Sequence, residues 1–175
     1  MYTLGIDIGL RNFGVCKLRT QSLCIVDLKC IGLNITQRKK FKESYAVASL
    51  FQSELNLDYI RDVSQVYIET PVPRARKTYW SLYNLLHYHF EHVLSIPCTG
   101  VAPKCKYDPN VYSLGNVSIP ENKRKLTYRD RKKESIKLFE ALQDHVECEQ
   151  TFSKKDDVAD AYLVAYYGLK CAVKK

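Results

Sequence analysis

Apolar residues recur at strand spacing early in the chain and at helical spacing late in it, and this order restricts the folds available. Runs that predict β-strands lie at residues 2–8, 12–18, 23–31, 63–69 and 96–102. Runs with helical spacing lie at residues 40–55, 78–94, 131–146 and 155–172. Turn-forming Pro, Gly and Asn predict a long loop at 104–126. This order predicts an α/β sheet flanked by helices.

The chain length also limits the organisation of the molecule. At 175 residues it suffices for one buried core, and neither an internal repeat nor a Gly/Ser/Pro-rich linker divides it. We therefore expect a single domain that spans residues 1–175.

The sequence is basic, with a formal net charge of +8 at pH 7. Such a charge favours a polyanionic partner, either nucleic acid or an acidic membrane. No apolar run approaches the roughly 20 residues that cross a bilayer. The N-terminal stretch lacks the basic region of an export signal and carries Asp7. We expect an intracellular, soluble protein that binds nucleic acid and no membrane.

Seven cysteines show no repeated spacing, and their odd number is unlike a secreted disulfide framework. We expect reduced, mostly buried thiols. Cys98 and Cys105 have neither CxxC spacing nor a nearby histidine, which argues against zinc. His87, His89 and His92 are interpreted as ordinary helix residues.

Two acidic residues stand in apolar strands: Asp7 within residues 4–9, and Glu69 at the end of residues 66–69. An ionised side chain in such a place is costly unless it is paired or bound to a cation. If the two strands are neighbours, both carboxylates point into one site.

A third acidic segment, Asp156-Asp157-Val158-Ala159-Asp160, starts the last predicted helix. Residues three or four apart share a helix face, so either Asp156 or Asp157 lies beside Asp160. Clustered carboxylates repel one another unless cations neutralise them. Hard divalent ions such as Mg²⁺ accept oxygen ligands, and two of them about 3.5–4 Å apart support phosphodiester hydrolysis.

Each acid also has a purely structural interpretation. Asp7 would begin a turn, Glu69 would be a solvated strand end, and the aspartates would complement a helix N-terminus. Taken singly, these interpretations are at least as good as the functional one. The combination of an acid on the first strand, one on the fourth and one on a late helix favours a catalytic site.

Three motifs resemble the acidic motifs of the RuvC-type Holliday junction resolvases, of the RNase H-like superfamily. They are Gly5-Ile6-Asp7-Ile8-Gly9 with Arg11-Asn12-Phe13-Gly14 after it, Tyr67-Ile68-Glu69, and Asp157-Val158-Ala159-Asp160-Ala161. Tyr128-Arg129-Asp130-Arg131-Lys132-Lys133 and Asp156–Asp160 extend the resemblance to the poxvirus resolvases. It covers Thr3 to Leu169 and implies an RNase H-like fold with a central mixed five-stranded sheet flanked by helices.

The resemblance further implies a Mg²⁺-dependent endodeoxyribonuclease, a homodimer that resolves four-way junctions and related branched DNA by paired nicks. Asp7, Glu69, Asp157 and Asp160 match the four metal-binding acids, which favours Asp157 over Asp156. Two Mg²⁺ ions, replaceable by Mn²⁺, would serve each active site. A viral protein of this kind would act in genome processing or recombination in the host cytoplasm.

RuvC-type enzymes also place a lysine that opens the penultimate helix near the scissile phosphate. Lys133 aligns best with this catalytic residue, and Lys132 remains open. A cation there would stabilise charge that develops on the phosphate. A solvated lysine is the structural alternative.

Further basic residues follow the predicted catalytic strands and the long loop. As a group near the acids they favour contact with DNA phosphates, although a single surface lysine or arginine is normally only solvated. The expected DNA-binding residues are Arg11, Arg74, Arg76, Lys77, Lys123, Arg124, Lys125, Arg129, Arg131 and Lys132.

The predicted helix at 78–94 carries aromatic and apolar residues on more than one face. They are Tyr79, Trp80, Tyr83, Leu86, His87 and Phe90. Excess apolar surface favours a partner, so we expect this helix to contribute to a homodimer interface. Packing of the same residues on the sheet is the alternative.

Other functions remain to be separated by experiment. Another RNase H-like nuclease, acting on RNA/DNA hybrids or flaps, would keep the same acids. A non-catalytic nucleic-acid-binding module would explain the charge but not the acids in apolar strands. A sugar-kinase or Hsp70-like ATPase also begins with an Asp-x-Gly strand, but it needs a second Gly-rich phosphate loop and roughly twice the length.

Overall fold

The computed structural model describes residues 1–33, 42–108, 127–142 and 155–172. The strands are β1 Tyr2–Asp7, β2 Phe13–Arg19, β3 Ile25–Ile31, β4 Val63–Glu69 and β5 Cys98–Val101. The α-helices are α1 Lys42–Ser53, α2 Leu57–Ile60, α3 Lys77–Tyr88, α4 Tyr128–Leu142 and α5 Lys155–Ala172. A π-helical turn, η1 His89–Val93, extends α3, and a 3-10 helix, η2 Cys105–Tyr107, follows β5.

The five strands form one mixed sheet in the order β3-β2-β1-β4-β5. β2 pairs antiparallel with β1 and with β3, whereas β4 pairs parallel with β1 and with β5. The carboxyl ends of β1, β4 and β5 therefore meet at one edge of the sheet. This edge carries the acids that end β1 and β4.

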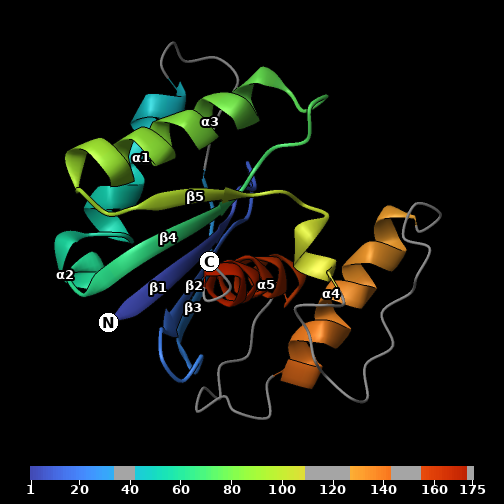
Figure 1. Cartoon of the computed structure of the whole chain (residues 1–175). Coiled ribbons are helices and arrows are strands. Elements are labelled where there is room, and N and C mark those ends of the chain that lie inside the picture. The colour runs from blue at the N-terminus through green and yellow to red at the C-terminus, as the bar shows by residue number, and fades with distance from the viewer. Residues whose placement is uncertain (34–41, 109–126, 143–154, 173–175) are drawn as a thin grey trace.

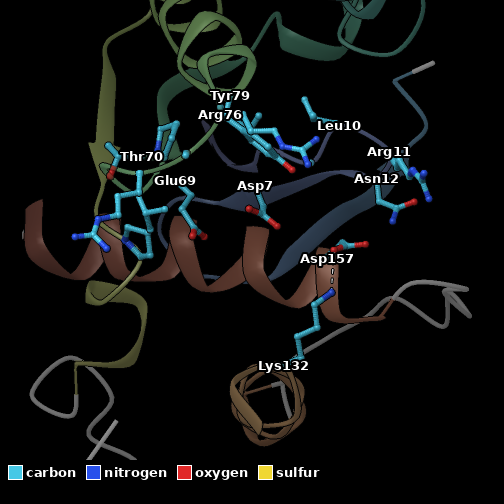
Figure 2. Close-up of a pocket in the computed structure, with 17 residues that line it drawn as sticks. Asp7, Leu10, Arg11, Asn12, Glu69, Thr70, Arg76, Tyr79, Lys132 and Asp157 are labelled. Atoms are coloured by element: carbon cyan, nitrogen blue, oxygen red, sulfur yellow. Dashed lines mark ion pairs between the residues drawn. The ribbon is translucent and has the colours of Figure 1, made fainter. Parts of the chain in front are cut away.

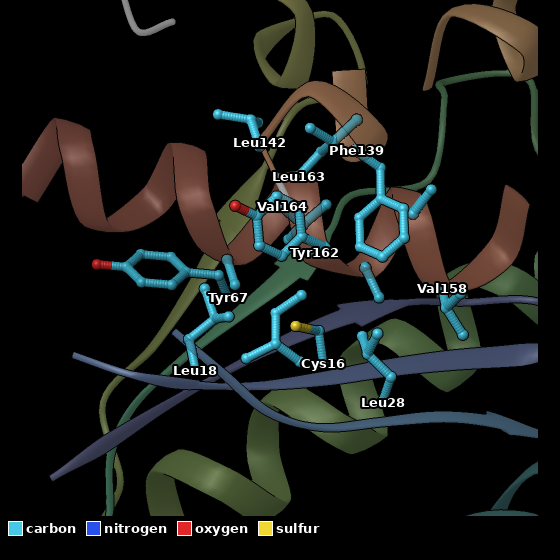
Figure 3. Close-up of a cluster of buried hydrophobic side chains, with 14 of the residues drawn as sticks. Cys16, Leu18, Leu28, Tyr67, Phe139, Leu142, Val158, Tyr162, Leu163 and Val164 are labelled. Carbon is cyan, nitrogen blue, oxygen red and sulfur yellow. The ribbon is translucent and has the colours of Figure 1, made fainter. Parts of the chain in front are cut away.

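Helices cover both faces of the sheet (Figure 1). α1 and α3 lie over one face, where Phe13, Leu86 and Phe90 are fully buried. α5 lies over the other face, and α4 packs against the outside of α5. Phe139 and Leu163 join these two helices to the sheet in a second buried cluster (Figure 3). Burial from both sides explains why Leu4, Gly5 and Ile6 of β1 do not alternate with polar residues.

α5 approaches β1 and β2 closely because two glycines face it. A Cβ at Gly5 would stand 2.1 Å from the carbonyl oxygen of Ala161, and one at Gly14 would stand 2.3 Å from that of Asp157. Neither distance leaves room for a side chain. The absence of these Cβ atoms lets the first turn of α5 lie beside the end of β1, where Asp7 ends the strand.

The mixed five-stranded sheet flanked by helices confirms the expected fold class, and the predicted strands and helices have counterparts with ends shifted by a few residues. The sequence did not predict α2, a four-residue helix that begins after Asn56. The predicted loop was wrong at its start, because η2 lies within it. Residues 109–126 of that loop lie outside the described residues.

The expectation of mostly buried thiols was wrong for the cysteines that the structure describes. Of these, only Cys16 and Cys98 are buried, and the partly exposed ones are Cys24, Cys30, Cys105 and Cys171. Cys30 lies on the edge strand β3, and Cys171 lies in the last turn of α5, where fewer neighbours cover a side chain.

None of the helices in the described part of the chain is both long and apolar enough to span a membrane.

Candidate active site

The sheet register sets Asp7 beside Glu69. Ile6 of β1 pairs with Ile68 of β4, and each acid is the next residue along its strand. Both carboxylates point toward α5 (Figure 2). The expectation that neighbouring strands bring these two acids together is confirmed.

The first turns of α5 add the remaining acids. Asp157 lies beside Asp7 because Gly14, the β2 partner of Asp7, lets the α5 backbone approach. Asp160 is one helical turn further on and is close enough to raise the pKa of Asp7, as Asp157 is. All four acids that the resemblance selects therefore meet at the carboxyl edge of the parallel strands.

A cleft of about 830 Å³ opens at this edge. Asp7, Glu69 and Asp157 line it, and Asp156 does not. The other lining residues come mainly from the turn after β1 and the segment after β4, and they are Ile8, Gly9, Leu10, Arg11, Asn12, Thr70, Pro71, Val72, Arg74, Ala75, Arg76, Tyr79, Pro103 and Lys132. The cleft thus has acids along one wall and arginines around them.

A lysine that the sequence analysis missed lies among the acids. The Lys106 ammonium is 2.6 Å from Oε2 of Glu69 and 2.9 Å from Oδ1 of Asp160, and the residue is only 4% exposed. It belongs to η2, directly after β5. The available signal was the position of Pro103-Lys104-Cys105-Lys106 after the fifth strand, since parallel strands end at the same edge.

Burial and mutual repulsion dominate the electrostatics of the acids. Burial first, and then the Glu69 carboxylate, raises the pKa of Asp7 well above its usual value. Burial also raises the pKa of Glu69, an effect that Lys106 opposes. Burial alone would lower the pKa of Lys106, but Asp160, Glu69 and Asp7 together raise it well above its usual value. A cation among the acids is therefore strongly favoured.

Lys132 is the second cation at the site. It reaches from α4 toward the start of α5, contacts the Asp156 carboxylate, and its Nζ lies 3.8 Å from Oδ1 of Asp157 (Figure 2). Lys133, which the alignment favours, is exposed and does not line the cleft, whereas Lys132 does. Adjacent helix residues point about 100° apart, so only one of the two faces the acids.

The remaining basic residues occupy different places. Arg11, Arg74 and Arg76 line the cleft and are exposed. Lys77, Arg129 and Arg131 are exposed and do not line it. Lys123, Arg124 and Lys125 lie outside the described residues.

The aromatic residues of α3 divide into two groups. Leu86 and Phe90 are fully buried in the core, as the structural alternative required. Tyr79, Trp80 and Tyr83 are only partly buried, and the last two rings pack edge to face with centroids 6.0 Å apart. Tyr79 and Tyr83 pack against the core cluster and, with Trp80, leave a partly exposed aromatic surface on α3.

The donor set fits a divalent cation by its chemistry. It consists of carboxylates, the ligands that hard cations take, and burial first, then neighbouring carboxylates, raise the pKa values of Asp7 and Glu69. In the described residues, no three acidic, His or Cys side chains lie close enough together to hold a metal ion as they stand. The Lys106 ammonium lies between Glu69 and Asp160.

A family model described as Poxvirus A22 protein matches residues 116–173, roughly a third of the chain. This stretch includes α4 and α5, which carry Lys132, Asp157 and Asp160. No curated protein matches the chain.

Solved structures match almost the whole chain. Thermus thermophilus RuvC superposes with a TM-score of 0.64 at 15% identity, over 99% of this chain and 96% of that one. Fowlpox virus resolvase, solved with substrate Holliday junction DNA, gives 0.65 at 13% identity over 99% of both chains. T. thermophilus RuvC in complex with Holliday junction substrate gives 0.63 at 14% identity, over 99% of this chain and 96% of that one. The fold is thus that of RuvC, and the resemblance to this group is confirmed.

Proposed function

We propose that this chain, with its RuvC fold and its match to the poxvirus family model, is a structure-selective DNA endonuclease. It would resolve four-way junctions and related branched DNA by paired phosphodiester hydrolysis. Each hydrolysis adds water across a P–O3′ bond and leaves a 5′-phosphate and a 3′-hydroxyl. The observation that carries the proposal is that acids from β1, β4 and α5 meet at one edge of the sheet. Asp7, Glu69 and Asp157 line the cleft there, which arginines border, and Asp160 lies close to Asp7.

Asp7, Glu69, Asp157 and Asp160 would hold the metal ions. Mg²⁺ is the cation we propose, with Mn²⁺ as a substitute, because carboxylates and phosphate oxygens are its usual ligands. When bound, the metal would lower the pKa of water and neutralise charge on the phosphate.

The lysines would have separate tasks. Lys106 is buried beneath the acids and does not line the cleft, so it would keep Glu69 and Asp160 in place and not touch DNA. Lys132 lines the cleft beside Asp157, and we propose that its ammonium approaches the scissile phosphate. There it would stabilise the charge that grows on the phosphate oxygens.

Arg11, Arg74 and Arg76 would contact phosphates on either side of the scissile bond. They border the cleft, and guanidinium groups bind phosphate in a bidentate manner. Phosphate contacts position a protein on DNA without reading its sequence. This fits a branched substrate, which is defined by shape.

We also propose a homodimer that uses the partly exposed aromatic surface of α3, formed by Tyr79, Trp80 and Tyr83. Aromatic side chains are enriched in protein interfaces, and a twofold interface uses the same patch on both subunits. Two active sites related by a twofold axis would suit a symmetric junction.

The test is incubation of the protein with an end-labelled four-way junction and Mg²⁺. Paired nicks placed symmetrically across the branch point are expected, and omission of the divalent ion should abolish them. The Asp7→Asn variant should not cut, because it loses a charge and hardly any volume, but should bind the junction as tightly as the wild type in a gel-shift assay. Full nicking by Asp7→Asn would refute the site.

Two outcomes would point to the other functions. Faster cleavage of an RNA/DNA hybrid or a flap than of the junction would favour a different RNase H-like nuclease. Tight junction binding without metal-dependent cutting by the wild type would favour a non-catalytic binding module.

A further inference from the structure

The position of Lys106 depends on a very short element. η2 has three residues, and its backbone hydrogen bonds include Cys105 N–H to the Ala102 carbonyl at 2.8 Å and Asp108 N–H to the Cys105 carbonyl at 3.0 Å. A 3-10 turn of this length has little stability of its own. Contacts with neighbouring elements must therefore fix η2 in place.

Tyr107 makes such a contact with α4. Its hydroxyl lies 2.6 Å from the Ser135 hydroxyl and donates a longer hydrogen bond, 3.5 Å, to the Arg131 carbonyl. Ser135 is fully buried. The Tyr107 ring also lies beside Lys106, with the ammonium 5.7 Å from the ring centroid.

The same helix carries the second lysine of the site. Ser135 lies three residues after Lys132, so both are on neighbouring positions of one helix face. The Tyr107–Ser135 hydrogen bond thus joins η2, which brings Lys106 to the acids, to α4, which brings Lys132 to Asp157.

We propose that Tyr107 and Ser135 are positioning residues, whose hydrogen bond sets Lys106 against Glu69 and Asp160. The effect on cleavage rests on the proposed nuclease function. The effect on Lys106 does not, and the two are measured separately.

The first experiment observes Lys106 directly, by NMR of the ¹⁵N-labelled lysine ammonium groups, with Lys106→Met to assign the signal. A buried, ion-paired ammonium exchanges its protons slowly with water. Exchange should become about tenfold faster in Tyr107→Phe and in Ser135→Ala, which each remove one hydroxyl of the pair. Tyr162→Phe is the matched control, since Tyr162 is 2% exposed and its ring contacts Phe139 of α4.

The second experiment measures the single-turnover rate of junction cleavage at saturating Mg²⁺, and the dissociation constant for the junction in Ca²⁺. Tyr107→Phe and Ser135→Ala should each lower the rate about tenfold and leave the dissociation constant unchanged. The double variant should be no slower than either single one. In a Lys106→Met background, Tyr107→Phe should cause no further loss, because it acts through Lys106.

Unchanged ammonium exchange in Tyr107→Phe would overturn the proposal whatever the enzyme cuts. Equal rate losses in Tyr107→Phe and Tyr162→Phe would also overturn it, because they would indicate a general loss of packing. A wild type that cuts no junction would refute the proposed function, and the ammonium exchange would then decide the positioning role alone.

Discussion

Two lysines pair with different acids at the site. Lys106 contacts Glu69 and Asp160, and Lys132 contacts Asp156 and lies near Asp157. Removal of one partner from a buried ion pair costs about 3–5 kcal/mol, because the other charge stays buried without compensation. The lysines are thus part of the architecture of the site as well as sources of charge.

Lys132 and Lys133 are adjacent on α4, so substituting each in turn tests which of the two ammonium groups takes part in cleavage. Lys132→Ala should lower the single-turnover cleavage rate by about a hundredfold, because it removes a charge near the phosphate. Lys133→Ala should stay within about twofold of the wild type, since Lys133 is exposed away from the cleft. A larger loss in Lys133→Ala than in Lys132→Ala would contradict the assignment of Lys132.

The four acids could be predicted at the residue scale because charges in apolar runs are conspicuous. Asp7 and Glu69 stand out for this reason, and the resemblance was needed to prefer Asp157 over Asp156. Lys106 could not be found in the same way. It follows a short strand in a segment rich in turn residues, and only the parallel arrangement of β1, β4 and β5 reveals that this segment ends beside the acids.

At the scale of elements, the contact of α5 with β1 and β2 places half of the acids. It requires glycine at two strand positions that face the α5 backbone, Gly5 and Gly14. Helical spacing predicted α5, but a spacing argument does not say which strand a helix approaches. The two glycines indicate which strands α5 approaches, because only a residue without a Cβ allows a helix backbone to come so close.

Gly5→Ala should therefore destabilise the protein by about 2–3 kcal/mol, because the added Cβ would stand 2.1 Å from the Ala161 carbonyl oxygen and push α5 away. Gly32→Ala is the control, since a Cβ there meets its nearest atom at an ordinary 3.8 Å. Urea unfolding measures both free energies. A loss in Gly32→Ala as large as in Gly5→Ala would contradict the role of the close approach.

The elements that escaped prediction are the short ones. α2 has four residues and η2 has three, and such lengths show no periodicity to detect. The π-helical turn η1 was predicted only as helix, since residues 78–94 have helical spacing throughout. Long, periodic segments were predicted because burial on one face fixes their pattern.

At the scale of the whole molecule, the proposed dimer has a direct test. Sedimentation should give twice the 20.3 kDa mass of one chain. Trp80→Ser should shift the protein toward the monomer, because Trp80 contributes the largest ring of the α3 surface. Tyr45→Ser on α1, where Tyr45 is 77% exposed, should leave the mass unchanged. A monomeric wild type would contradict the proposed dimer.

The acids of the site come from parts of the chain that are far apart in sequence, from residue 7 to residue 160. During synthesis, β1 and β4 leave the ribosome well before α5. Until α5 has been synthesised, the site therefore contains the carboxylates of β1 and β4 but not those of the last helix. Pairing over such separations forms late in folding, because loop closure must come first. A nascent or partly folded chain should thus be harmless to nucleic acid, and the capacity to cut would arise only when α5 docks.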